Sequence, residues 1–383
     1  MATASFDPLH FLMKISPDLL SRYAKHHGID FKTKEKEAGE QVAEEFMKML
    51  EQESEDKRAA FWLDTCDIDE IGTGNGCDYI LNRAVEQGFN INEEDYQKLR
   101  NSKERAMYFY LNFYELFCET YDEYGIENMQ GWRSEKAASK DIDKILVNVA
   151  DFENGLKALY GKEYKGKNLK VKYLRKTERI IFTAYVEDAF TNDMSFKKGN
   201  LNPKTPRKPV FMAYFLYVPK EQLLEVKAHG GAKKIQELQA AFIRLMLKEE
   251  PAITNNVRYD FERVRNINAL YFPTQATDFV ESVTLKGLRL IHNSTKTSLI
   301  IDIGNTSRSG TEPIIESLKA MNIDLLDYRI TQFKIKVVFK SQGKGRKRKV
   351  TTAITYPNIC DLKEREIDII VYQLLRRWGL DLF

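Results

Sequence analysis

The chain has few residues of the kinds that form covalent or metal cross-links. Its 383 residues include five histidines and four cysteines, namely Cys66, Cys77, Cys118 and Cys360. No two cysteines form a CxxC pair, and no histidine stands at zinc-ligand spacing from them. We therefore expect neither a disulfide framework nor a metal site, and the pattern suits a reducing compartment.

Long hydrophobic runs are also missing. No window approaches the roughly 18 consecutive apolar residues that a membrane-spanning helix needs. The opening MATASFDPLHFLMK lacks the cationic stretch and apolar core that mark a signal peptide. Apolar residues still make up 43% of the chain and charged residues 30%, which is typical of a folded protein. We expect a cytoplasmic protein with no membrane partner.

Basic residues are scarce in the front of the chain, and acidic residues are outnumbered in the rest. Residues 1–160 carry 19 Lys and Arg against 32 Asp and Glu, whereas residues 161–383 carry 40 against 24. A basic half favours a polyanionic partner such as nucleic acid. It also fits two halves that face each other, or charges that are only solvated.

Hydrophobic spacing predicts helices in the front part of the chain. Apolar residues recur at helical intervals over 17–27, 33–54, 102–121 and 134–160. After about residue 160 the apolar residues alternate, as they do in strands. We expect an α+β protein, with an N-terminal helical domain followed by a mixed, largely antiparallel sheet-and-helix region. The domains expected are 1–160, acidic and helical; 161–275, basic α+β; and 276–383, a C-terminal α+β domain with a basic hairpin.

Several strands can be placed individually. KNLKVKYLRK and ERIIFTAYVED are typical of paired strands, and VFMAYFLYVP is typical of a buried one. Residues 196–209 are polar and contain proline, which predicts a loop, and 232–248 predicts a helix. In QFKIKVVFK, Phe333 and Ile335 alternate with Lys334 and Lys336, so one strand face is buried and the other cationic. VTTAITYP alternates in the same way, which predicts a hairpin with the basic tip SQGKGRKRK.

Two clusters of cations are the strongest functional signal. The first comprises Lys334 and Lys336 on the strand face and, at the tip, Lys344, Arg346, Lys347, Arg348 and Lys349. The second includes Lys170, Lys172 and Arg175, interleaved with Tyr164 and Tyr173, on whose rings bases can stack. Clustered cations bind phosphates and release counterions. A solvated hairpin tip and strand-edge lysines that prevent aggregation are the alternatives.

Two glycine-containing motifs resemble phosphate-binding loops but lack the required context. Residues 72–76, GTGNG, follow acidic helix and precede Cys77, whereas a P-loop continues with Gly-Lys-Ser/Thr. LIIDIGNTSRSG resembles the first phosphate motif of actin-like kinases, but only about 80 residues follow Asp302, too few for such a domain. We expect a helix–helix turn and a strand end, and no cofactor.

A third motif is the ExK of metal-dependent nucleases, Glu225-Val226-Lys227. Those enzymes need a further carboxylate that shares a divalent ion, for which Asp188 and Asp193 are candidates. An exposed strand is the alternative. No Ser-His-Asp or Cys-His arrangement is evident, so the residues predict no catalytic group.

Three stretches together resemble a family of bacterial proteins of similar length. They are DPLHFLMKISPDLLSRYAKHHGIDF, then FLYVPKEQLLEVKAHGGAKKIQELQAAFIRLML, and finally YRITQFKIKVVF with TAITYPNICDLKERE and LLRRWGL. The closing stretch is the most specific, and no activity is assigned to that family. The resemblance implies a place in defence or mobile-element loci beside ATPases or helicases, and therefore a protein partner of that kind.

The residues and the resemblance together predict a non-enzymatic, nucleic-acid-binding component of a bacterial multi-protein system, such as one for anti-phage defence. A metal-dependent nuclease that uses Glu225 and Lys227 is one alternative. A protein–protein adaptor that docks through the acidic helical half is the other.

Overall fold

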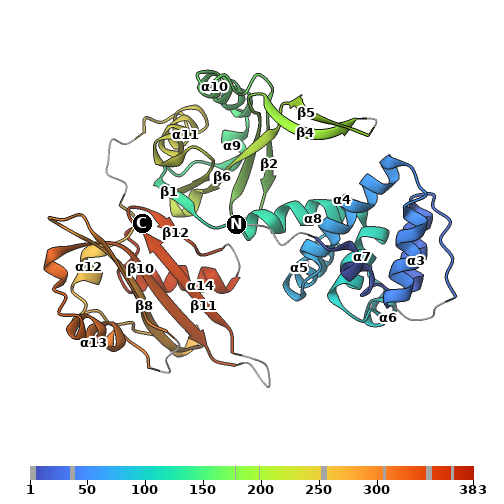
Figure 1. The fold of residues 1–383 in the computed structure, drawn as a ribbon. Helices are drawn as coiled ribbons and strands as arrows, with labels where there is room; N and C mark the ends of the chain where they lie inside the picture. Colours follow the sequence, from blue (N-terminus) through green and yellow to red (C-terminus); the bar gives the residue numbers. More distant parts are fainter. Residues whose placement is uncertain are drawn as a thin grey trace. The chain divides into compact units, whose positions relative to one another are not determined.

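A computed structural model describes residues 6–34, 39–176, 178–197, 199–251, 257–304, 308–341, 347–363 and 366–383. The chain forms two compact units, residues 1–128 and 129–383 (Figure 1). Unit 1 carries 14 Lys and Arg against 27 Asp and Glu, and unit 2 carries 45 against 29. The charge asymmetry of the sequence therefore follows the division into units.

Unit 1 is helical in the part of the chain that the structure describes. Side-chain caps begin several of its helices: Ser54, Thr73 and Asn101 each accept a hydrogen bond from a backbone amide of the first turn. One apolar side of most helices packs into a shared core. The helices are α1 (Pro8–Leu12), α2 (Pro17–His26), α3 (Glu40–Leu50), α4 (Glu55–Ile71), α5 (Gly74–Glu86), α6 (Glu93–Gln97), α7 (Ser102–Asn112) and α8 (Tyr114–Glu127).

The single helix expected over 102–121 is two helices. Phe113 has φ −143° and ψ 55°, and it separates α7 from α8. Its ring packs against Phe89 and Phe109. The segment is apolar around most of its circumference. The break at Phe113 allows α7 and α8 to bury different sides of this apolar surface.

Unit 2 is built on a ten-stranded sheet whose paired strands are antiparallel. The strand order is β2-β3-β6-β7-β1-β12-β11-β10-β8-β9. The predicted α+β class, with helices in front and a mixed sheet-and-helix region behind, is confirmed. The strands are β1 (Trp132–Lys136), β2 (Leu169–Arg175), β3 (Ile180–Glu187), β6 (Val210–Val218), β7 (Leu223–Lys227), β8 (Val280–His292), β9 (Ser298–Asp302), β10 (Tyr328–Phe339), β11 (Lys349–Thr355) and β12 (Ile359–Cys360).

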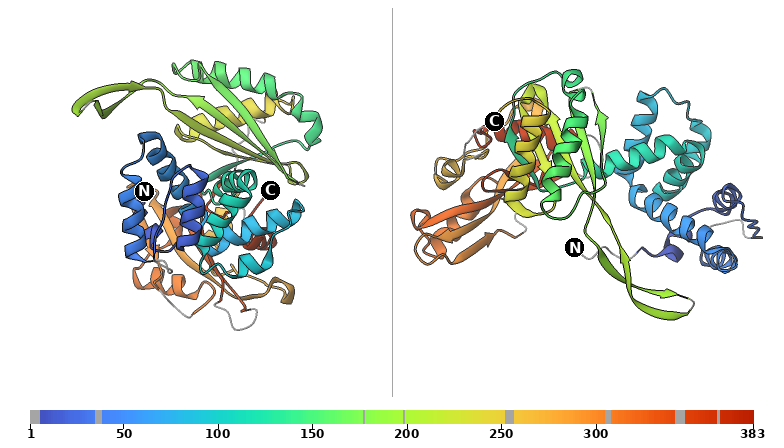
Figure 2. Two further views of the ribbon diagram at one scale, coloured as in Figure 1. Left: turned by 90° about the vertical axis from the view of Figure 1, so that its right-hand side faces the viewer. Right: turned by 90° about the horizontal axis from the view of Figure 1, so that it is seen from above.

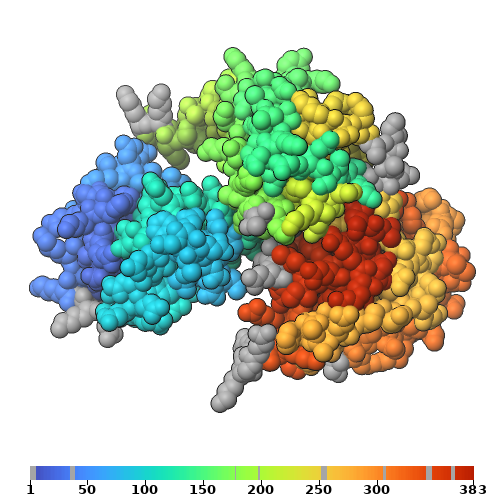
Figure 3. All heavy atoms as spheres, turned by 180° about the vertical axis from the view of Figure 1, so that it is seen from behind, coloured from blue at the N-terminus to red at the C-terminus, as the bar shows by residue number. Residues whose placement is uncertain are grey.

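Helices cover the sheet over two separate apolar cores. α10 (Val149–Gly161) and α11 (Gly231–Leu245) pack against β2 and β7, with α9 (Ile142–Leu146) beside them. α12 (Phe261–Arg265), α13 (Glu312–Ala320) and α14 (Glu366–Arg377) pack on the half that contains β8, β10 and β11. Short 3₁₀ turns lie at Pro219–Glu221, Ala276–Asp278 and Leu325–Asp327. The C-terminal helix α14, red in Figure 3, also contacts the half of the sheet that contains β6 and β7. Arg376 of α14 donates a hydrogen bond at 2.6 Å to Glu221, which lies between these two strands.

Two further segments, both in unit 2, differ from the sequence-based expectation. The long helix expected over 134–160 is strand β1 followed by α9 and α10, because Trp132 to Lys136 pair with β12 and β7 and join the two halves of the sheet. α9 and α10, which fall within the helical domain expected over 1–160, therefore belong to unit 2. The loop expected over 196–209 is largely strand: β4 (Thr191–Lys197) and β5 (Asn200–Arg207) form a ribbon that extends from the sheet between β3 and β6 (Figure 2).

Candidate nucleic-acid interface

The second predicted cluster lies on the edge strand of the sheet. In β2, Leu169 and Val171 are buried in the core, so Lys170 and Lys172 point to the opposite face. The register places Lys170 beside Tyr185 and Lys172 beside Thr183 of β3. The two predicted lysines therefore share one exposed face.

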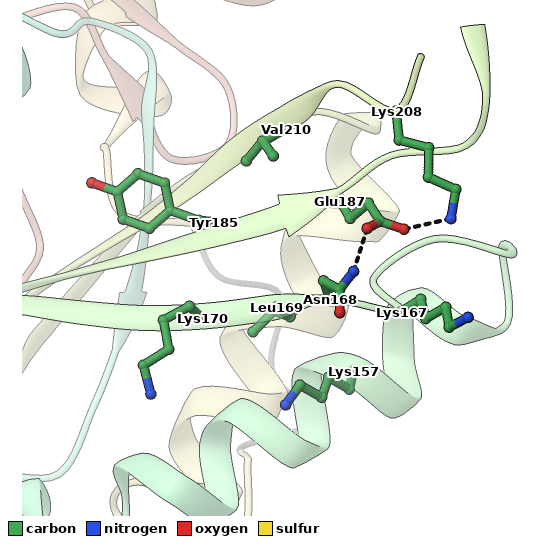
Figure 4. Close-up of a pocket in the computed structure, with 9 residues that line it drawn as sticks. All are labelled: Lys157, Lys167, Asn168, Leu169, Lys170, Tyr185, Glu187, Lys208 and Val210. Carbon is green, nitrogen blue, oxygen red and sulfur yellow. Dashed lines mark hydrogen bonds and ion pairs between the residues drawn. The ribbon is translucent and has the colours of Figure 1, made fainter. Parts of the chain in front are cut away.

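A pocket of about 340 Å³ opens beside this edge (Figure 4). Four lysines line it: Lys157 on α10, Lys167 two residues before β2, Lys170 in β2, and Lys208 directly after the last ribbon strand, β5. They converge although they are spread over fifty residues of sequence. The remaining lining residues are Asn168, Leu169, Tyr185, Glu187 and Val210.

Two carboxylates partly balance these cations. Glu187 accepts hydrogen bonds from Lys208, at 2.7 Å, and from Asn168, and these bonds lower its pKa. Burial would raise the pKa of Glu153, but the Val171 amide, Lys157 and Lys170 hold it below its ordinary value. The charge of Lys167 also lowers the pKa of Glu187, so the four pocket lysines are matched by two carboxylates. Positive charge is therefore in excess at the pocket.

Arg175, the third residue of this cluster, is engaged elsewhere. Its guanidinium makes two hydrogen bonds to the carboxylate of Asp143 on α9. Lys172 lies over the ring of Tyr185, 5.5 Å from its centroid. The structure thus brings Lys170 and Lys172 to the pocket region and ties Arg175 to a helix.

The first predicted cluster follows the β10–β11 hairpin. The register pairs Val338 with Lys349, so Lys349 stands on the same face as Lys334 and Lys336. Lys334 forms an ion pair with Asp302 at 2.5 Å, and Lys347 forms one with Glu281 at 2.7 Å. Arg348 and Lys349 are exposed.

Lys344 and Arg346 lie outside the described residues. The strand part of the expected cationic face is therefore present, while the basic tip as a whole stays a prediction.

The nuclease motif occupies a buried structural position. Glu225 is 2% exposed and accepts hydrogen bonds from Arg258 and Ser134, each at 2.8 Å. Lys227 donates to the carbonyl of Gln130. The two aspartates that the nuclease hypothesis requires form ion pairs with other residues: Asp188 with Lys165, and Asp193 with Arg207. Within the described ranges, no group of three His, Cys, Asp or Glu side chains could hold a metal ion.

The glycine-rich motif at 72–76 is a helix–helix turn. Thr73 caps α5 by accepting from the amide of Gly76 at 3.0 Å. A Cβ at Gly76 would collide with the carbonyl of Ile71. In the other motif, Lys286 donates to the carbonyls of Ile303 and Gly304, and residues 305–307 lie outside the described part.

No protein-family model matches the chain, and no curated protein is significantly similar to it. None of the helices in the described segments is both long and apolar enough to span a membrane. The pocket includes three residues that the sequence does not single out, Lys157, Lys208 and Tyr185, because only the tertiary structure brings them beside Lys170.

Proposed function

We propose that this protein binds nucleic acid through its phosphate backbone. The observation that carries the proposal is the convergence of Lys157, Lys167, Lys170 and Lys208 on one open pocket at the sheet edge. Ammonium groups on flexible stems are point charges that neutralise phosphates and release counterions. Lysines at a pocket of this kind present no fixed code to base edges, so we expect binding to depend little on sequence.

Unit 2 as a whole supports the same partner. Its excess of Lys and Arg over Asp and Glu, 45 against 29, attracts polyanions over distances of about a Debye length. The β10–β11 hairpin presents Lys334, Lys336 and Lys349 on one face and offers a second contact for a backbone. Binding through two such surfaces would weaken steeply as salt concentration rises.

A protein partner is a second proposed role, and it concerns unit 1. Trp62 and Leu63 of α4 are exposed, at 47% and 64%, on a unit with 14 basic and 27 acidic residues. Exposed large apolar side chains within a charged surface are typical of protein contacts. The protein would then act as the nucleic-acid-binding component of a larger bacterial assembly, with a partner such as an ATPase or helicase and a role such as defence.

The binding proposal is tested by fluorescence anisotropy with labelled oligonucleotides at about 50 mM and about 200 mM salt. The test variant replaces four pocket lysines with glutamine, at Lys157, Lys167, Lys170 and Lys208. The matched control makes the same change in charge at exposed lysines of unit 1: Lys25, Lys32, Lys48 and Lys98.

We expect the pocket variant to bind more weakly and to show a smaller salt dependence, by about one unit of slope per lost phosphate contact. The control should bind like the wild type, because screening limits the effect of distant charges. Absence of binding by the wild type at the lower salt concentration would refute the proposal. An equal loss in both variants would show that the pocket itself is not the binding surface.

A further inference from the structure

Aromatic rings lie next to the cations of the lysine pocket. Tyr185 lines the pocket, and Lys172 lies over its ring. Phe190, at the base of the β4–β5 ribbon, is 71% exposed, and the ammonium of the pocket residue Lys208 lies 4.7 Å from its ring centroid. Each of these rings is thus within reach of a cation that can hold a phosphate.

A third ring lies on the loop that carries Lys167. Tyr164 is 94% exposed and has φ 59°, a backbone conformation that is uncommon for a bulky residue. The loop is fixed by hydrogen bonds from the Tyr164 and Lys165 amides to carbonyls of α10, and from the Gly166 amide to Glu187. This hydrogen-bonded loop therefore exposes the ring of Tyr164 to solvent, three residues from the pocket residue Lys167.

The β4–β5 ribbon, which ends next to the pocket residue Lys208, also exposes apolar side chains. Met194 and Phe196 are alternate residues of β4, and Phe196 pairs with Leu201 of β5, so the three side chains share a face. They are 75%, 75% and 57% exposed, respectively. On the other face, Ser195 and Thr205 hydrogen-bond to each other and Asp193 pairs with Arg207. The polar side chains on one face of the ribbon thus bond to one another, whereas the apolar side chains on the other face are exposed and accessible to a ligand.

We propose that the lysine pocket and the adjoining rings bind single-stranded nucleic acid, with unpaired bases stacked on Phe190 and Tyr185 and the backbone held by lysines. This inference rests on the proposed function and adds its substrate class. Rings interleaved with cations are the combination that single strands require, because every base has a stacking face and every nucleotide a phosphate. A duplex keeps its bases stacked inside the helix and leaves the rings without partners.

The size of the pocket agrees with this assignment. A volume of about 340 Å³ lies at the lower end of the range for sites that enclose a small molecule. It can take a flipped-out or unpaired nucleotide, whereas a double helix is far wider and could only lie across its opening. Lys208 would link the two parts of the site, because it lines the pocket and also lies over Phe190.

The test compares a single strand with the duplex of the same sequence, using wild type, Phe190→Leu and the control Phe279→Leu. Leucine keeps an apolar side chain but lacks the aromatic face. Phe279 is also exposed, at 53%, and belongs to the other half of unit 2. A strand that contains 2-aminopurine reports stacking directly, because stacking quenches its fluorescence.

We expect Phe190→Leu to weaken single-strand binding by roughly tenfold and to reduce the quenching, while duplex binding stays unchanged. The control should match the wild type in both assays, and circular dichroism should show that both variants are folded. Equal binding of single strand and duplex, with no effect of Phe190→Leu, would overturn this inference and leave the proposed function intact. No binding of either nucleic acid by the wild type would overturn both.

Discussion

Arg258 and Glu225 form an ion pair at 2.8 Å in the interior of unit 2, where both side chains are nearly inaccessible to solvent. Asp381 completes the arrangement, because it accepts two further hydrogen bonds from the same guanidinium, at 3.0 and 3.1 Å. Ser134 bridges Arg258 and Glu225. The network joins β1, β7 and the C-terminal residues, and it gives Glu225 a structural role.

Removal of the Glu225 carboxylate should destabilise the protein strongly. Glu225→Ala leaves the Arg258 charge buried with one of its two carboxylate partners missing, and loss of a partner from a buried pair typically costs about 3–5 kcal/mol. Urea unfolding followed by circular dichroism measures the change. As a control, Glu221→Ala removes an exposed partner of Arg376 and should cost no more than about 1 kcal/mol. Similar losses in the two variants would contradict the structural role.

The environment of Glu225 also argues against the alternative that the protein is a metal-dependent nuclease. With Mg²⁺ or Mn²⁺, we expect the purified protein to leave DNA and RNA intact, because Glu225 is engaged with Arg258 and Ser134. Metal-dependent cleavage that is abolished in Glu225→Gln would instead show a catalytic carboxylate. Glutamine keeps the shape of the side chain, so loss of folding is a smaller concern in that variant.

The hairpin cations should contribute to binding without contributing to the fold. Replacement of Arg346, Lys347, Arg348 and Lys349 with alanine should weaken binding of all sequences to a similar degree. Stability should change little, because the Lys347–Glu281 pair is exposed and such pairs are worth about 0–1 kcal/mol. Anisotropy titrations at two salt concentrations and a thermal melt measure the two quantities. Unchanged affinity would restrict the interface to the lysine pocket.

The stability of unit 1 should depend on His27 in mildly acidic solution. Burial lowers the pKa of His27, against the attraction of Asp64 at 3.3 Å and with the help of His26. The unfolded chain, with an ordinary pKa of about 6.5, therefore binds a proton before the folded protein does. Stability should fall as the pH drops below about 6.5 and through the lowered pKa of the folded state.

Thermal melts at pH 7.5 and at about pH 5 test this dependence. His27→Gln should lose less stability over that interval than the wild type, whereas His10→Gln, an exposed substitution in the same unit, should behave like the wild type. Identical losses in all three proteins would show that the pKa of His27 is not shifted in the expected direction.

Two neighbouring glycines should respond in opposite ways to alanine. Gly76→Ala places a Cβ against the carbonyl of Ile71, and overpacking of this kind typically costs about 1–3 kcal/mol. Gly74→Ala meets no atom within 4 Å and should be neutral or stabilising by up to about 1 kcal/mol. Urea unfolding of both variants measures the difference. Destabilisation by Gly74→Ala to the same extent would refute the tight turn.

Local pattern was sufficient for much of unit 2. The alternation of Phe333 and Ile335 with Lys334 and Lys336 predicts the two faces of β10, and the structure confirms them. β6 and α11 also lie where the residue spacing predicts them. Such elements could be predicted because one side of each is apolar at the period of its own secondary structure.

Long-range pairing decided the remainder. Ser134 to Lys136 stand at the start of a stretch with helical spacing, yet Trp132 to Lys136 form β1. Their hydrogen-bonding partners in β7 lie 87 to 93 residues away in the sequence, and those in β12 lie 226 to 228 residues away. Proline and polar residues over 196–209 predict a loop, yet Asn200 to Arg207 of that stretch form strand β5, because β4 supplies hydrogen-bonding partners for them. A window of local sequence contains no information about such partners.

The amino-acid sequence by itself determined the α+β class, the separation of charge and the identity of most cationic residues. Only the tertiary structure decided which cations act together. It tied Arg175 to Asp143 and Lys334 to Asp302, and it gathered Lys157, Lys167, Lys170 and Lys208 around one pocket. It also buried Glu225 with Arg258. The physical reason is that the strength of an electrostatic interaction depends on distance and burial, and both are set by packing between segments that are remote in sequence.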